Sequence, residues 1–167
     1  MDHEKIKQLI QARKKPKEVF MLELPSSVDE IQDRSVELVS DEVEEKELLT
    51  LDISRYGLQI KRNKSQFRYN KTNIILRLDI YSTHTNPEFV EEKAPMELKE
   101  LMKKYSSKRF LKEAHLHFYI EGYNDKWAFP LCEFGLKEKD NFKEMVEEFC
   151  KFCNIVDLKF IYGSLFC

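Results

Sequence analysis

The stretch that decides the fold of this chain is His115-Leu116-His117-Phe118-Tyr119-Ile120-Glu121. Apolar and polar residues alternate along it, which is typical of a β-strand with one buried face and one polar face. We expect the leucine, phenylalanine and isoleucine to point into the core. The opposite face then carries two imidazoles, a phenol and a carboxylate, and this face is the best candidate for a functional surface.

A second strand with the same alternation is predicted from Asn73 to Tyr81. One of its faces is entirely aliphatic, whereas the other carries Arg77 and Asp79. If helices cover the apolar faces of both strands, their polar faces lie together on the opposite side of the sheet. Candidate catalytic residues on that shared face are Arg77, Asp79, His115, His117, Tyr119 and Glu121.

The rest of the chain alternates short strand patterns with a few helices. Helical spacing of apolar residues predicts helices over 3–15 and 95–105 and a final helix that begins with Asp140 as its N-cap. Further strands are expected at 19–24, 34–40, 47–54, 66–69, 126–131 and 158–166. Short turns between consecutive strands predict a single α+β domain over residues 1–167. Its antiparallel or mixed sheet carries the N-terminal and C-terminal helices on one face.

Composition excludes several classes of protein. No apolar run approaches the roughly 20 residues of a membrane-spanning helix, and the charged N-terminus lacks the apolar segment of a signal peptide. We therefore expect a cytoplasmic protein without a membrane partner. The CxxC pair Cys150 and Cys153 has no second pair at similar spacing and falls late in a helical pattern. This favours buried structural thiols over a zinc ribbon or a redox site.

Charge is unevenly distributed, although the net charge is only −2. The segment 41–47 is acidic, whereas 61–71 and 99–112 are basic. The basic segments favour nucleic acid as a partner and the acidic segment favours a protein. All three segments are also compatible with ordinary solvated faces. The open sheet face and the strand predicted at 158–166 offer surface for a homodimer.

Three interpretations of the polar face stay open at this point. In the first, the histidines exchange protons without a cofactor, Arg77 binds a phosphate, and Tyr119 and Lys126 position the substrate. That set suits RNA cleavage, in which the 2′-hydroxyl is the nucleophile. In the second, His115 and His117 bind a divalent metal with Asp79 or Glu121. In the third, the face is a hydrogen-bonded network or a binding interface without chemistry.

Residues at the edge of this face are candidates for substrate binding. The segment from His84 to Pro87 brings an imidazole and an amide to the rim, although Asn-Pro is also ordinary turn chemistry. A basic hairpin near Lys61 offers a phosphate-binding edge, or lysines that discourage edge pairing. The candidates are His84, Asn86, Lys126, Arg62 and Arg68.

Several of these motifs together resemble an uncharacterised family of short proteins from Gram-positive bacteria, their prophages and their mobile elements. The similar motifs are Arg77-Leu78-Asp79, His84-x-Asn86-Pro87, His115-x-His117-x-Tyr119-x-Glu121-Gly122-Tyr123-x-Asp125-Lys126-Trp127-Ala128 and Cys153-Asn154-Ile155. The resemblance covers about residues 57–155. It departs from the family pattern at Glu88, at Ile120, where a basic residue is common, and in the helix within 95–112.

The resemblance implies a genetic neighbourhood in which toxins, antitoxins and agents of phage–host conflict are common. We therefore expect one of two functions. The first is a ribonuclease-like toxin or another nucleic-acid-processing enzyme whose substrate is RNA. The second is a non-enzymatic module, an antitoxin or an inhibitor, that binds a protein encoded by the phage or its host.

Overall fold

A computed structural model describes residues 1–19, 21–24, 31–56 and 63–162 of the chain. Its main sheet has seven strands in the order β1-β3-β4-β5-β6-β7-β8, and every neighbouring pair is antiparallel. These strands are β1 (Lys15–Pro16), β3 (Ile31–Val39), β4 (Leu49–Tyr56), β5 (Asn63–Tyr69), β6 (Asn73–Thr85), β7 (Arg109–Ile120) and β8 (Asn124–Pro130). Two further strands, β2 (Met21–Leu24) and β9 (Lys159–Tyr162), form a separate parallel pair.

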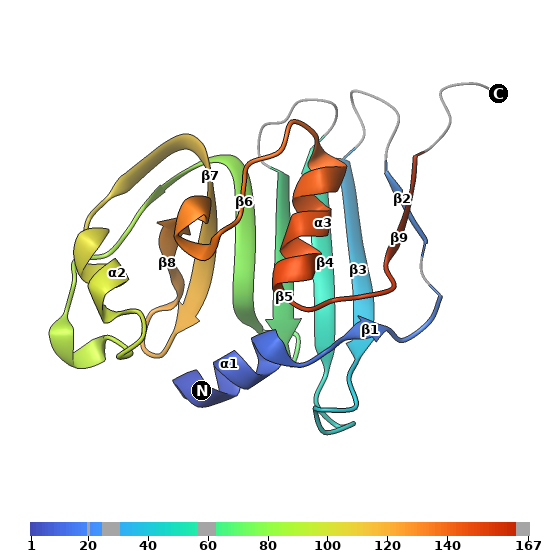
Figure 1. Ribbon diagram of the computed structural model, residues 1–167, viewed down its shortest axis with the longest axis horizontal. Coiled ribbons are helices and arrows are strands. Elements are labelled where there is room, and N and C mark those ends of the chain that lie inside the picture. Colours follow the sequence, from blue (N-terminus) through green and yellow to red (C-terminus); the bar gives the residue numbers. More distant parts are fainter. Residues whose placement is uncertain (20, 25–30, 57–62, 163–167) are drawn as a thin grey trace.

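Helices cover one face of the main sheet. The helices are α1 (His3–Gln11), α2 (Lys99–Lys104) and α3 (Phe142–Phe152), with 3₁₀ turns η1 (Glu91–Lys93) and η2 (Leu131–Phe134). Figure 1 shows α3 in front of β4 and β5, running along these strands, and α1 crossing the strand ends on the same side. The prediction of a single α+β domain with its N-terminal and C-terminal helices on one face is confirmed.

A row of directly paired side chains forms the centre of the core beneath these helices. Leu51, Phe67, Leu76, Phe118 and Trp127 are successive cross-strand partners on β4 to β8, and all five are buried. Side chains alternate between the two faces of a strand. The neighbours of these residues therefore lie on the face that carries no helix.

Both long helices begin or end at different residues from those predicted. The Oδ1 of Asn141 accepts the amide of Glu144 at 2.9 Å, so the N-cap of α3 is Asn141 and the prediction of Asp140 is wrong. The first helix ends at Gln11 instead of 15. The reason is Lys14, whose fully buried ammonium donates to carbonyl groups at the end of α1.

The hairpin β6–β7 is longer than the alternation indicated, and it bends. Tyr81 and Lys112 have φ values of 58° and 55°, and the pairing register shifts around Ser82. Left-handed backbone is uncommon for residues with a side chain, so the sequence gives little sign of this bend. We call residues 82–113, beyond the bend, the arm. In Figure 1 the arm extends past the other strands and carries α2 at its tip.

The arm returns to the outer edge of β8 through Asn86. Its amide nitrogen donates to the Ala128 carbonyl at 2.8 Å, and its amide oxygen accepts the Ala128 N–H at 2.9 Å. One side chain thus takes the place of a paired strand and satisfies both backbone groups of a fully buried residue. The base of the arm is therefore fixed to the edge of β8.

Among the described residues, no helix is long and apolar enough to cross a membrane. The CxxC pair agrees with its predicted structural role, because Cys150 and Cys153 are free and buried in and directly after α3. Burial raises the pKa of the Cys150 thiol to about 12, so this thiol stays protonated at neutral pH.

Candidate functional site

The two polar strand faces lie side by side, as the sequence predicted. Strands β6 and β7 are neighbours, with Arg77 opposite His117 and Asp79 opposite His115. Directly opposed side chains on one face of an antiparallel pair lie within contact distance. This face is the one that α1 and α3 leave uncovered. Together with His84 and Asp125, which contact them, these four residues form what we call the histidine centre.

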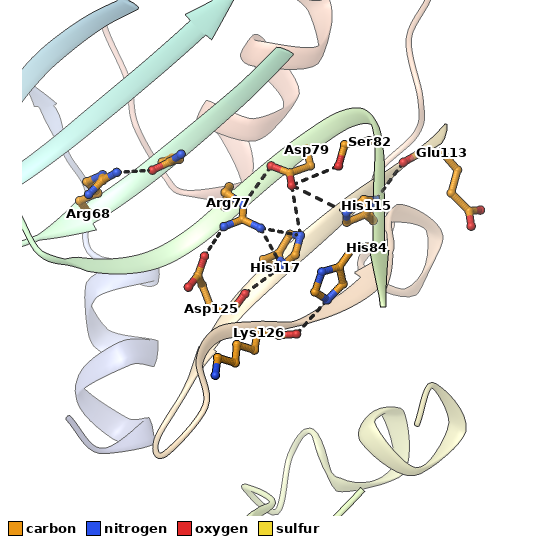
Figure 2. Close-up of polar contacts among 11 residues, drawn as sticks. Arg68, Arg77, Asp79, Ser82, His84, Glu113, His115, His117, Asp125 and Lys126 are labelled. Carbon is orange, nitrogen blue, oxygen red and sulfur yellow. Dashed lines mark hydrogen bonds and ion pairs between the residues drawn. The ribbon is translucent and has the colours of Figure 1, made fainter. Parts of the chain in front are cut away.

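Ion pairs and hydrogen bonds of Asp79 and Arg77 link the residues of the histidine centre to one another (Figure 2). The Oδ2 of Asp79 lies 3.3 Å from Nε2 of His117 and 3.9 Å from Nε2 of His115. The guanidinium of Arg77 donates from Nε to the Oδ1 of Asp79 at 2.9 Å and from Nη1 to Asp125. Its Nη2 lies 3.0 Å from Nε2 of His117. Two carboxylates therefore neutralise one arginine.

Backbone carbonyl groups fix the orientation of both buried imidazoles. Nδ1 of His115 donates to the carbonyl of Glu113 at 2.9 Å, and Nδ1 of His117 donates to the carbonyl of Asp125 at 2.9 Å. Because a carbonyl only accepts, each Nδ1 carries the proton. Nε2 of both rings then faces Asp79. Within the described part of the chain, Nε2 of His115 has no hydrogen-bond partner.

A third imidazole closes the centre from the arm. The ring of His84 lies edge-on to His117 at 4.5 Å between centroids, and it stacks on His115 at 5.9 Å. Its Nε2 donates to the carbonyl of Lys126 at 2.9 Å. Phe110, on the other strand of the arm, covers His115, with 4.7 Å between the two ring centroids. His115 and His117 are fully buried, whereas His84 is partly exposed.

Burial sets the protonation of these groups at neutral pH. It lowers the pKa of His115 to about 4, and the nearby His117 acts in the same direction. Burial and His117 also lower the pKa of His84. For Asp79, burial alone raises the pKa, but the contact with His117 and the charge of Arg77 outweigh it and hold the pKa below its usual value. The centre thus combines an ionised carboxylate with at least two neutral imidazoles.

The pKa of His115 predicts that acid destabilises the metal-free protein. An unfolded histidine binds its proton near pH 6.5, whereas folded His115 binds one only near pH 4. Between these values the unfolded state binds more protons, so stability is lost as the pH falls. We expect this residue to lower the free energy of unfolding by about 2 kcal/mol between pH 7 and pH 5. Urea unfolding in EDTA at the two pH values checks this. A His115→Gln variant that keeps the full pH dependence would contradict it.

Two of the predicted catalytic residues lie away from the histidine centre. Tyr119 was expected on the polar face, but the pairing between β7 and β8 shifts between Phe118 and Ile120. The side chain is instead buried among apolar residues and lines a cavity with His3 and Ile6 of α1. The prediction that Tyr119 shares a face with the histidines is therefore wrong.

Glu121 lies beyond that shift, in the turn after β7. Its exposed carboxylate is 3.5 Å from the N-terminal amine of Met1. The expectation that Glu121 continues the polar face next to His117 is likewise wrong, because the strand ends at Ile120.

The predicted binding residues lie in different parts of the structure. His84 lies in the histidine centre, and Asn86 lies at the base of the arm. Lys126 contributes its carbonyl, and Figure 2 shows its side chain directed away from His84. Arg68 lies on the same face of β5, where it pairs with Asp52 at 2.6 Å and donates to Gln66 at 2.6 Å. Arg62 lies outside the described residues.

Sequence reasoning missed Asp125 and Phe110. Asp125 follows Gly122 and Tyr123 in a stretch that predicts a turn, and turn residues rarely suggest a contact with a distant strand. Asp125 in fact lies at the start of β8, which places its carboxylate against Arg77 and its carbonyl against His117. Its signal in the sequence was its place in the run from His115 to Ala128 that carries the family resemblance.

Comparison with known proteins identifies a family. The model of DUF6978, described as a family of unknown function, matches residues 1–155, so the chain belongs to that family. The searches of curated proteins and of solved structures returned no match. The predicted membership of an uncharacterised family is thereby confirmed, and the match extends through α1 as well as the segment 57–155.

Proposed function

We propose that this member of the DUF6978 family cleaves RNA at the histidine centre. The observation that carries the proposal is the position of the centre on the sheet face without helices, with His84 partly exposed, between two basic segments. Register places Lys64 of the first segment beside Asp79, and the ammonium of Lys108 in the second segment lies 4.8 Å from the ring of Phe110, which covers His115. Positive side chains on both sides attract a phosphate backbone toward the imidazoles.

His84 is the histidine that a substrate reaches, because it is partly exposed and the other two are buried. Its Nε2–H is held by the Lys126 carbonyl, so Nδ1 is the nitrogen that accepts a proton. In the proposed reaction His84 takes the proton of the 2′-hydroxyl, and the 2′-oxygen attacks the adjacent phosphorus. The bond to the 5′-oxygen breaks, this oxygen takes a proton from water, and His84 gives its proton to the hydroxide that is left. The products are a 2′,3′-cyclic phosphate and a 5′-hydroxyl.

This activity fits the genetic setting implied by the family resemblance. A small enzyme that damages RNA suits a toxin of a prophage or mobile element, or another participant in phage–host conflict. The chemistry requires no diffusible cofactor, since the nucleophile belongs to the substrate.

One observation favours a second candidate function, binding of a protein partner. Arg77 and Arg68 are already paired with carboxylates, which weakens their attraction for phosphate. An uncovered face of alternating, internally paired charges is also suited to a complementary protein surface. In that case the chain is an antitoxin or an inhibitor, and the histidines fix the shape of the surface.

RNA cleavage by the purified full-length chain distinguishes the two functions. The assay uses a mixed RNA pool, in EDTA and with added divalent metals, and detects cyclic phosphate ends. We expect His84→Gln to reduce cleavage at least 100-fold, the usual effect of removing a catalytic proton acceptor. His3→Gln is the matched control, because His3 lies on α1 beside Glu97 and outside the centre.

The proposal fails if the wild-type chain cleaves no RNA under either condition, or if His84→Gln cleaves as fast as His3→Gln. Circular dichroism of both variants serves as the control that checks whether the fold is retained. If no RNA is cleaved, the binding function is tested next by reversing the charges of Arg68 and Lys64. A protein that the wild-type chain captures should no longer be captured by this variant.

A further inference from the structure

We infer that Asp79, His115 and His117 bind one divalent transition-metal ion, with Zn²⁺ as the best match. This inference goes beyond RNA cleavage and does not depend on it. The three side chains come from two adjacent strands, and one candidate ligand atom from each lies within 4.8 Å of the other two.

The distances suit a small metal ion. Zinc binds imidazole nitrogen and carboxylate oxygen at about 2.0–2.2 Å with tetrahedral geometry, which places neighbouring ligand atoms about 3.3 Å apart. The Oδ2 of Asp79 is 3.3 Å from Nε2 of His117 and 3.9 Å from Nε2 of His115. Small side-chain rotations therefore bring all three atoms onto one ion.

The surroundings of the ligands are those of a metal site. Histidine ligands generally donate their second ring nitrogen to a carbonyl or carboxylate, which fixes the tautomer and the ring plane. His115 and His117 both do so, through the carbonyls of Glu113 and Asp125. Arg77 holds the other oxygen of Asp79 at 2.9 Å. Each ligand is thus oriented before an ion arrives.

The strongest single indication is Nε2 of His115. This atom belongs to a fully buried ring, points toward Asp79, and has no hydrogen-bond partner among the described residues. A buried polar atom without a partner is costly, so native proteins rarely retain one without a reason. A metal ion at this position gives the atom a partner.

The donor set also selects the class of metal. Two imidazoles and one carboxylate favour zinc and its transition-metal neighbours, whereas magnesium and calcium prefer oxygen ligands. Three protein ligands would leave one position of a tetrahedral ion for water or another ligand. Binding breaks the contact of Arg77 Nη2 with His117, and Arg77 keeps its contacts with Asp79 and Asp125.

Metal content and calorimetry test the site without RNA. The untagged chain is purified without chelator and analysed by mass spectrometry for metals, then stripped and titrated with ZnCl₂ or MgCl₂. We expect one zinc per chain and at least 100-fold weaker zinc binding in Asp79→Asn and in His117→Gln. His3→Gln and Cys132→Ser are the controls, since both side chains are candidate zinc ligands outside the site and should leave the affinity unchanged.

Thermal unfolding of the wild type is a second measurement that needs no variant. We expect zinc at about 100 times its Kd to raise Tm by about 5 to 10 °C, and magnesium to leave Tm unchanged. The inference is overturned if the stripped chain shows no saturable heat with zinc and no change in Tm. It is also overturned if folded Asp79→Asn and His117→Gln bind zinc as tightly as the controls. If the chain cleaves RNA in EDTA but binds no zinc, the metal inference fails and the proposed RNA cleavage is retained.

Discussion

Lys14→Met is expected to lower the free energy of unfolding by about 3 kcal/mol, although lysine is rarely a core residue. The side chain of Lys14 is fully buried, and its ammonium donates to the carbonyl groups of Leu9, Ile10 and Ala12. These groups belong to the end of α1, where carbonyls have no partner within the helix and where positive charge is favoured. Methionine keeps the aliphatic stem in place and leaves the three carbonyls buried without a donor.

The effect on stability extends beyond α1 because Lys14 joins three parts of the fold. Its backbone N–H donates to the carbonyl of Asn154 at 2.9 Å, and its carbonyl accepts the N–H of Val156 at 2.8 Å. Its ammonium also lies 4.9 Å from the ring of Phe67 on β5. The segment thus ties the first helix to the chain that follows α3 and to the central sheet.

Urea unfolding at pH 7 measures this prediction, with Lys15→Met as the matched control. Lys15 is the exposed neighbour on β1, and its substitution is expected to change stability within about 0.5 kcal/mol. Burial lowers the pKa of Lys14 to about 8, so the ammonium is still mostly charged at this pH. Equal stability of the two variants would show that the buried amine does not cap the helix.

Asn86→Ala is the second substitution with a large expected effect, a loss of about 3 kcal/mol. Asn86 is only 4% exposed, and its amide makes hydrogen bonds to the carbonyl of Tyr105 and to both backbone groups of Ala128. Alanine leaves the N–H and the carbonyl of a fully buried residue unpaired. It also frees the base of the arm, two residues from His84.

The matched control is Thr85→Ala, because Thr85 is exposed and adjacent in the chain. Urea unfolding gives the stability of both variants, and zinc titration and RNA cleavage report on the centre. We expect Asn86→Ala to reduce cleavage while zinc binding persists, because His84 belongs to the arm and the proposed metal ligands belong to the sheet. Wild-type stability of Asn86→Ala would contradict the role of Asn86 as a substitute for a paired strand.

The sequence predicts the sheet and the four β6 and β7 residues of the histidine centre for the same reason. Alternation along β6 and β7 fixes which side chains face away from the core, and both strands place their charged residues on that face. The pairing of Arg77 with His117 follows once the two strands are neighbours. A hairpin between sequential strands is common, even with an intervening helix.

The remaining parts depend on features that alternation does not encode. The bend at Tyr81 and Lys112 places left-handed backbone at residues that seldom adopt it, so the return of the arm to β8 was not predictable. A one-residue shift after Phe118 moved Tyr119 into the core, since such a shift exchanges the two faces of a strand. The contact between Asp125 and Arg77 joins the start of β8 to β6, which lies on the far side of β7 in the sheet, and no local pattern reports it.

The most direct test of the histidine centre is the tautomeric state of its rings, measured by long-range ¹H–¹⁵N NMR correlation in EDTA at pH 7. The structure predicts a neutral His115 with its proton on Nδ1, a proton on Nδ1 of His117, and a proton on Nε2 of His84. Zinc should then shift the Nε2 signals of His115 and His117. A proton on Nε2 of His115 would contradict the arrangement, because that nitrogen would face Asp79 as a hydrogen-bond donor and the centre would be a closed polar network.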